Sequence, residues 1–285
     1  MLLRPLIPLA LVAVTVAAAQ GPGGPLPEMD AFLREVRENL ARSQHISHRY
    51  SYKERRTDMH FNPFGRIGTH GTSVFQVYPA SNPQLAYRRL YERDGKPVAE
   101  GELRRQDYEY RQKVAEVKRR MAREDNDDRK RRERDELLAR TRAQRMIQDA
   151  VSMLEFRIVR REPRSGRSAI VVAFTPKANA RPVTREGRIA KSFTGNVWID
   201  EAEREVVRVE ARAVEDIAFG GFIAKLQEGT NAMLNRREIE PGVWMPTDVA
   251  FKGEGRALLF RKLSINYLVE WFDYRLMSRD GPRLP

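Results

Sequence analysis

The sequence predicts an α+β protein built on one strongly curved antiparallel sheet of about ten strands, a half-barrel wrapped over an N-terminal helix, with a long charged helical insertion. Three observations lead to this fold class. Short runs of alternating apolar and polar residues recur along the chain, turn residues separate these runs, and a proline-free charged stretch interrupts them between residues 100 and 155.

The N-terminus has the composition of a removable signal peptide over residues 1–19. Arg4 supplies a positive charge, residues 6–16 are apolar, and Ala17–Ala19 precede Gln20 as small cleavage-site residues. A membrane anchor, the alternative, needs about 20 uninterrupted apolar residues, and this stretch is shorter. We therefore expect export to the periplasm or secretion, a linker over residues 20–27, and a single domain over residues 28–285.

The first folded element is expected to be a helix over residues 28–43, because apolar residues recur there at helical spacing. From Ile46 the period falls to two, which predicts a strand beginning there. Strand-like runs follow at 72–78, 84–92 and 96–99, separated by turn residues such as Asp94–Gly95. This pattern is typical of an antiparallel meander.

The charged insertion is expected to be helical. Residues 100–150 contain sixteen Lys and Arg against thirteen Asp and Glu. Two thin apolar stripes lie on either side of the polar cluster Asp125–Asp128. A helical hairpin would bury both stripes against each other, whereas a single long helix is also consistent with the absence of Gly and Pro in the cluster.

Strand signals return after the insertion. The clearest run alternates apolar with charged residues, as expected for a sheet with one face exposed to solvent. Its apolar residues are Val207, Val209, Ala211 and Ala213. The other predicted strands cover residues 156–161, 169–175, 195–200, 217–226, 230–238, 243–253, 256–263 and 265–277.

Composition excludes several classes of function. The formal net charge of +13 is spread among acidic residues along the whole chain, which argues against nucleic acid as the partner and favours contact with anionic headgroups or acidic partners. The chain contains no cysteine, so neither disulfides nor thiol chemistry is expected. After residue 19, no apolar run is long enough to span a bilayer.

No catalytic motif is present, so we expect no enzyme, cofactor or metal. The four histidines, His45, His48, His60 and His70, fall in one short stretch, but their spacing matches no metal-binding motif. The acidic cluster at Asp125 lacks the glycine that a calcium-binding loop requires.

Aromatic residues on the predicted strands are the candidates for lining a ligand cavity. Any single one of them more often fills a core, but a curved sheet with few helices leaves an apolar concave face that something must cover. The candidates are Phe75, Tyr87, Trp198, Phe219, Phe222, Trp244, Phe251 and Phe260.

Several segments resemble the LolA-like superfamily of lipoprotein carriers, which also includes LolB-like and RseB-like domains. They are Tyr50-Ser51-Tyr52-Lys53-Glu54, Val77-Tyr78-Pro79, Tyr87-Arg88-Arg89-Leu90, Gly195-Asn196-Val197-Trp198-Ile199-Asp200, Gly242-Val243-Trp244-Met245-Pro246 and Phe272-Asp273-Tyr274-Arg275. The resemblance implies a half-open curved sheet whose apolar concavity receives lipoprotein acyl chains. The charged insertion has no counterpart in the simple carriers.

These observations predict a periplasmic binding or carrier domain, not an enzyme, that shelters a lipid or lipoprotein acyl chain in a concave sheet. The alternative is an envelope interaction or sensor protein whose helical arm, residues 100–155, docks a protein partner.

Overall fold

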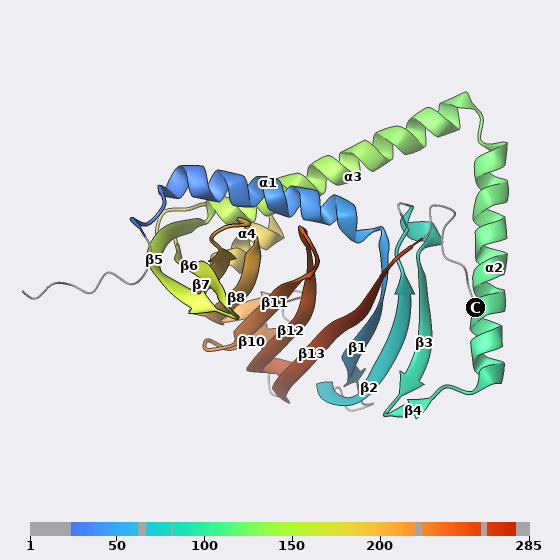
Figure 1. The fold of residues 1–285 in the computed structure, drawn as a ribbon. Coiled ribbons are helices and arrows are strands. Elements are labelled where there is room, and N and C mark those ends of the chain that lie inside the picture. Colours follow the sequence, from blue (N-terminus) through green and yellow to red (C-terminus); the bar gives the residue numbers. More distant parts are fainter. Residues whose placement is uncertain (1–23, 62–66, 81, 220–223, 258–260, 278–285) are drawn as a thin grey trace, which may run out of the picture.

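The structure is a computed structural model that describes residues 24–61, 67–80, 82–219, 224–257 and 261–277 (Figure 1). The predicted signal peptide lies outside the described residues. Within the part described, no helix combines the length and the apolar composition needed to cross a bilayer.

Thirteen strands among the described residues form one sheet, and every pairing between them is antiparallel (Figure 1). The main path runs β4-β3-β2-β1-β13-β12-β11-β8-β7-β6-β5, so the sheet is open, with β4 and β5 at its two edges. The predicted curved antiparallel sheet is confirmed. The strands are β1 Tyr50–Phe61, β2 Ile67–Tyr78, β3 Tyr87–Arg93, β4 Lys96–Pro97, β5 Leu154–Arg164, β6 Arg167–Pro176, β7 Phe193–Asp200, β8 Val206–Ala213, β9 Ile217–Phe219, β10 Ala224–Leu226, β11 Asn231–Glu240, β12 Val243–Ala257 and β13 Arg261–Leu276.

Helix α1, Met29–Ser47, begins at Glu28, whose carboxylate accepts hydrogen bonds from the backbone N–H groups of Asp30 and Ala31. The helix is longer than the predicted 28–43, and the strand predicted to begin at Ile46 is wrong. The N–H of Arg49 donates to the carbonyl of Ile46 at 3.0 Å, so the backbone there is still helical, and β1 begins at Tyr50.

One face of the sheet can be followed strand by strand, because directly opposed residues in antiparallel strands share a face. A single row of opposed residues crosses ten strands from β5 to β3. In order, it consists of Ile158, Val172, Val197, Val209, Leu234, Val249, Val269, Arg56, Ser73 and Arg93. Helix α1 packs on this face over β5 to β8, and we call it the inner face.

The insertion forms two helices, α2 Glu100–Arg123 and α3 Asn126–Ser152, so the single long helix is excluded. The chain breaks without Gly or Pro because the Asp125 carboxylate accepts from the N–H groups of Asp127 and Asp128 and starts a new helix. The helices diverge from an elbow instead of packing as a hairpin (Figure 1). Helix α2 packs on β3, while α3 returns to β5 and to α4, Arg185–Ala190.

Four further details differ from the sequence expectation. Helix α4 was not predicted. The strand expected from residue 84 is preceded by a 3₁₀ turn, Pro83–Leu85, and β3 begins only at Tyr87. The run 217–226 contains two short strands, β9 and β10. The strand predicted for 256–263 is not a separate element where the structure describes it, because residues 256–257 belong to β12 and residues 261–263 to β13.

Candidate ligand-binding face

The inner face is apolar over β5 to β8, where α1 closes it. Phe32 and Val36 of α1 are buried against Ile170, Val172 and Ile199 of the sheet. Apolar side chains at the margin of this cluster, including Leu33 and Leu40 of α1, complete a packed core. This half of the face is therefore filled by the protein's own side chains.

The apolar surface continues past the strands that contact this core. Leu234, Val249, Phe251 and Tyr267 on β11 to β13 face the same way by their register, and each is only partly buried. Phe251 packs against the buried pair Ala213 and Ile217 at one end of this surface. Partly buried apolar side chains in a continuous row form a surface that an apolar ligand can complete.

Beyond β13 the inner face becomes aromatic and charged. The register places Trp271, Glu54 and Phe75 side by side on β13, β1 and β2. The Arg88 guanidinium pairs with the Glu54 carboxylate and lies 4.0 Å from the Phe75 ring centroid, while the Arg56 guanidinium lies 4.9 Å from it. The Trp271 indole N–H donates to Glu54 at 3.3 Å.

The pKa shifts indicate that this polar end is partly shielded from water. Burial lowers the pKa of Arg88, and the neighbouring Arg56 charge acts in the same direction, while Glu54 opposes both. Burial also raises the pKa of the Tyr52 phenol, and the Glu54 charge adds to this effect. Two guanidinium groups around one ring and a single adjacent carboxylate suit the polar end of an amphiphilic molecule.

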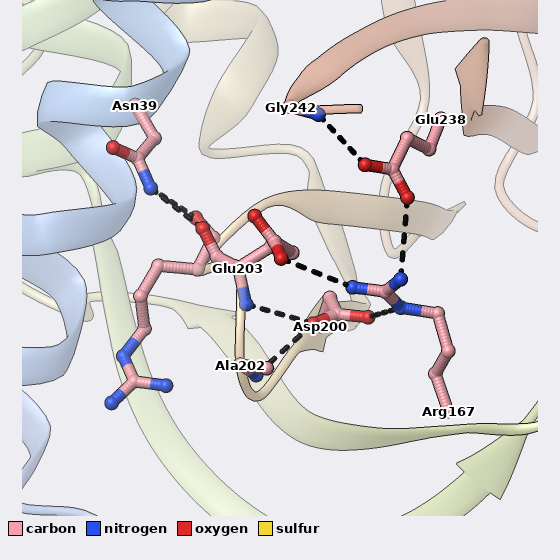
Figure 2. A network of polar contacts seen from close by, with 8 residues as sticks. Asn39, Arg167, Asp200, Ala202, Glu203, Glu238 and Gly242 are labelled. Atoms are coloured by element: carbon pink, nitrogen blue, oxygen red, sulfur yellow. Dashed lines mark hydrogen bonds and ion pairs between the residues drawn. The ribbon is translucent and has the colours of Figure 1, made fainter. Parts of the chain in front are cut away.

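A polar network holds α1 against the turn between β7 and β8 (Figure 2). Asp200 accepts hydrogen bonds from the backbone N–H groups of Ala202 and Glu203 and pairs with Arg167, which also pairs with Glu238 at 3.2 Å. Asn39 of α1 donates to the carbonyl of Glu203 at 2.7 Å. The network therefore fixes the position of α1 over the inner face.

A second ion pair lies under α1. The Arg236 guanidinium is 2.8 Å from the Glu205 carboxylate, and each side chain is 8% exposed. The Ser43 hydroxyl of α1 donates to the same carboxylate at 2.9 Å. Because breaking one partner of a buried pair leaves an uncompensated charge, this contact resists displacement of the helix.

Two hollows have charged side chains in their linings. A hollow of about 400 Å³ at the elbow between α2 and α3 is lined by Glu116, Arg119, Arg120, Arg123, Glu124 and Asp128. Another of about 350 Å³ beside α4 is lined by Pro182, Arg185, Arg188, Ile189, Lys191, Ser192, Glu215, Asp216 and Ile217. The first is lined by charged residues throughout, which does not suit an acyl chain, whereas the second combines five charged residues with Ile189 and Ile217 of the apolar cluster that Phe251 joins.

No protein-family model matches the sequence, and no curated protein shows significant similarity to it. Solved structures do show similarity. A domain assigned to outer-membrane lipoprotein sorting from Vibrio parahaemolyticus shares 11% identity, with 87% of this chain and 92% of that chain covered and a TM-score of 0.30. A LolA superfamily protein from Nitrosomonas europaea shares 10% identity over 88% and 94%, with a TM-score of 0.28.

Both similarities are low in sequence identity and in TM-score. The complex of MucA and MucB from Pseudomonas aeruginosa also matches, at 8% identity, with 86% of this chain and 99% of that chain covered and a TM-score of 0.21. At these identities and TM-scores the similarity transfers neither a ligand nor a partner to this chain.

The predicted cavity residues do not gather on one face. Phe75 and Phe251 lie on the inner face. Tyr87 and Trp198 point to the opposite face by strand alternation. Trp244 is buried, and its indole N–H has no hydrogen-bond partner among the described residues. The Phe219 side chain and the residues Phe222 and Phe260 lie outside the part that the structure describes.

The two aromatic residues on the opposite face are covered by other groups. Tyr87 stacks on Tyr110 of α2 at 4.1 Å and donates to the Asp107 carboxylate at 2.6 Å. Burial and this hydrogen bond raise the pKa of the Tyr87 phenol. Trp198 is buried with Ala169 and Val171 under arginine side chains. Tyr87 therefore anchors the helical arm, and Trp198 packs within the opposite face.

Sequence reasoning did not select the polar end of the inner face. Glu54, Arg88 and Trp271 come from segments more than 30 residues apart, and Glu54 and Trp271 are separated by 217 residues. The alternation of Tyr52 with Lys53 did indicate that β1 has two different faces. No local pattern, however, tells that β1 pairs with β13.

Replacing Gly187 with alanine is expected to loosen the attachment of α3. A Cβ atom at Gly187 would lie 2.1 Å from an Asp149 carboxylate oxygen, and that carboxylate accepts hydrogen bonds from the backbone N–H and hydroxyl of Thr184. We expect the free energy of unfolding to fall by about 1–3 kcal/mol in a urea titration. Amide exchange at the C-terminal end of α3 should also become faster.

The matched control is Gly101→Ala in the first turn of α2, where a Cβ atom meets nothing within 4 Å. It should leave stability unchanged or raise it by up to about 1 kcal/mol, because alanine favours helix. Equal behaviour of the two variants would contradict the proposed role of the contact between Gly187 and Asp149.

Proposed function

We propose that this protein acts outside the cytoplasm, in the periplasm, as a binding or carrier domain for an apolar ligand, with lipid or lipoprotein acyl chains as the ligand class. The observation that carries the proposal is the row of seven apolar residues that crosses the inner face from β5 to β13. Its β5 to β8 part packs against the buried core of α1, α1 also lies close to β12, and Leu234 and Val249 beyond β8 are only partly buried. The proposal assigns no catalytic role.

The dimensions of the surface suit an acyl chain. Four strand spacings separate β8 from β1 in the sheet, and at about 4.8 Å each they span about 19 Å. Burial of a chain of about 14 methylenes at about 0.8 kcal/mol each supplies on the order of 10 kcal/mol before ordering costs. Such binding needs no specific polar motif, in agreement with the absence of one in the sequence.

The polar end of the ligand would lie near Phe75 and Arg88. The row changes from aliphatic to polar side chains between Val269 and Arg56, one strand apart. An amphiphile aligned along this row would place its chain on β8 to β13 and its head at the guanidinium groups. Because Glu54 already pairs with Arg88, the two arginines and the one carboxylate leave this site with one net positive charge.

Val249→Glu tests the proposal, with Ala250→Glu as its control on the adjacent position of the same strand. Val249 faces the inner side and Ala250 the opposite side, because neighbouring strand residues alternate. With a fluorescent long-chain fatty acid as probe, we expect Val249→Glu to weaken binding by about tenfold or more, equal to about 1.4 kcal/mol. Ala250→Glu should bind as the wild type does.

Circular dichroism of both variants separates loss of binding from loss of fold. Organic extraction of wild-type protein purified from its exporting host, followed by mass spectrometry, is expected to release lipid. A lipid-free wild-type protein that also fails to bind the fatty acid would refute the carrier function. Equal weakening by the two substitutions would show that the probe binds elsewhere.

A further inference from the structure

The inner face carries an unequal charge over β1 to β3. Register places Glu54 and Arg56 of β1 and Arg88 and Arg93 of β3 on this face, and among the described residues of these strands no other charged side chain faces the same way. Arg93 lies 3.9 Å from Glu102 of α2, at the edge of the sheet. The inner part of this surface is therefore arginine-rich, with Glu54 as its carboxylate.

The Glu54 carboxylate is engaged by two neighbours on the inner face. One of its oxygens pairs with Nη2 of Arg88, and the other accepts from the Trp271 indole N–H at 3.3 Å. The indole has no second donor, so Trp271 offers a ligand only its apolar ring. Glu54 therefore holds the Arg88 and Trp271 side chains together between the charged and the apolar parts of the face.

The Arg88 guanidinium keeps donors for a second acceptor. A guanidinium carries five N–H donors in a fixed plane, and Arg88 donates to Glu54 through Nη2. Its Nε and Nη1 groups have no partner among the residues that the structure describes. The group lies 4.0 Å from the Phe75 ring centroid, which holds it in position, and the side chain is 37% exposed. A second oxyanion can therefore reach Arg88 beside Glu54.

We propose that the inner face selects lipids with an acidic head, a carboxylate or phosphodiester of one negative charge, which binds at Arg88 while the chain follows the apolar row. This inference rests on the proposed function and narrows its ligand class. From Phe75 on β2 to Leu234 on β11 the sheet spans four strand spacings, about 19 Å at about 4.8 Å each. Trp271 and Val269 of β13 lie between these two ends.

The charge of the head decides between ligands of equal chain length. Water solvates a carboxylate more strongly than a hydroxyl group, so an apolar surface alone binds the alcohol more tightly than the acid. Charge-assisted hydrogen bonds from a guanidinium reverse this order. A head with two negative charges would be repelled by Glu54, which already lies at the same guanidinium. Preference for the acid therefore reports recognition of the head and not burial of the chain.

The test compares hexadecanoate with hexadecanol, which have chains of equal length, by equilibrium dialysis of the radiolabelled ligands against the full chain. We expect hexadecanoate to bind about tenfold more tightly than hexadecanol. Arg88→Gln should weaken the binding of hexadecanoate by about tenfold and leave that of hexadecanol unchanged. Circular dichroism checks that each variant is folded.

Glu54→Gln is expected to act in the opposite direction. It removes the carboxylate that competes for Arg88 but keeps an amide oxygen that can accept from Trp271. Hexadecanoate should bind about threefold more tightly, with no change for hexadecanol. This variant and the wild-type comparison decide the matter even if Arg88→Gln fails to fold.

The matched control is Arg55→Gln, which removes the same charge from the opposite face of β1. Arg55 pairs with Glu270 at 3.3 Å, and both ligands should bind this variant within about twofold of the wild type. Equal binding of acid and alcohol by the wild type, or an equal loss in Arg88→Gln and Arg55→Gln, would overturn the inference and leave the carrier function standing. Binding of neither ligand would refute both. Competition by acetate or inorganic phosphate as strong as that by hexadecanoate would overturn it in favour of a site for free anions.

Discussion

Replacing Phe32 with alanine is expected to lower the free energy of unfolding by about 3–5 kcal/mol. Phe32 is 2% exposed and belongs to the buried cluster that joins α1 to β6, β7 and β8. The Arg204 guanidinium also lies 5.1 Å from the centre of its ring. Urea unfolding followed by circular dichroism measures the effect.

The control for Phe32→Ala is Leu26→Ala, because Leu26 precedes α1 and is 45% exposed. A change of less than about 0.5 kcal/mol is expected there. If Phe32→Ala changed stability as little as the control, the packing of α1 on the inner face would be refuted. Partial unfolding confined to α1 should expose the aliphatic half of the inner face and increase the binding of a hydrophobic dye.

The α1 side of the core could be predicted from sequence. The apolar residues that recur at helical spacing over residues 28–43 are Met29, Phe32, Leu33, Val36 and Leu40, and all five belong to the cluster that packs on the sheet. The position of the helix end could not be read in the same way. Helical and strand patterns overlap over a few residues at Ile46. The hydrogen bond from the N–H of Arg49 to the carbonyl of Ile46 shows that the helix continues there.

Strand alternation was informative within single strands. Val209 lies on the inner face and Arg208 on the opposite face, as the run in β8 predicted. The relation between distant strands was not accessible, because the pairing of β1 with β13 joins Tyr50 to Leu276 across most of the chain. The register of β7 against β8 shifts between Trp198 and Ile199, so Val206 and not Val207 lies opposite Ile199. Composition does not encode this shift.

The candidate site was predictable in kind but not in detail. The sequence predicted an apolar concave face, and its aromatic candidates included Phe75 and Phe251, which lie on the inner face. It could not assign Tyr87 to the opposite face, because that depends on the register of β3 against β2. The break between α2 and α3 was also not predictable in detail. The Asp125 carboxylate caps the first turn of α3, so the chain starts a new helix there without Gly or Pro.

Replacing Asp200 with alanine is expected to destabilise the protein by about 3 kcal/mol, because one substitution removes a buried ion pair and the acceptor of two backbone N–H groups. The Asp200 side chain is 2% exposed and pairs with Arg167, and it accepts hydrogen bonds from Ala202 and Glu203 (Figure 2). Arg167 is 40% exposed, which places the expected loss at the lower end for a buried pair.

The same contacts make stability depend on pH. Burial alone would raise the pKa of Asp200, but the hydrogen bond from Arg167 and those from the backbone outweigh it, so the pKa is lowered below its usual value of 3.8. A carboxylate with a lowered folded-state pKa contributes its stabilisation above the unfolded-state pKa, and this contribution is lost as pH falls through the folded-state pKa. The wild type should therefore lose more stability than Asp200→Ala between neutral pH and acidic pH.

Asp200→Asn separates the two contributions of this side chain. Asparagine keeps a carbonyl oxygen that can accept from the N–H groups of Ala202 and Glu203, but it lacks the charge that pairs with Arg167. Its stability at neutral pH should fall between those of the wild type and Asp200→Ala, and its acid dependence should match that of Asp200→Ala. An acid dependence in Asp200→Asn as steep as in the wild type would mean that another carboxylate is responsible, and that the network in Figure 2 does not govern the seating of α1.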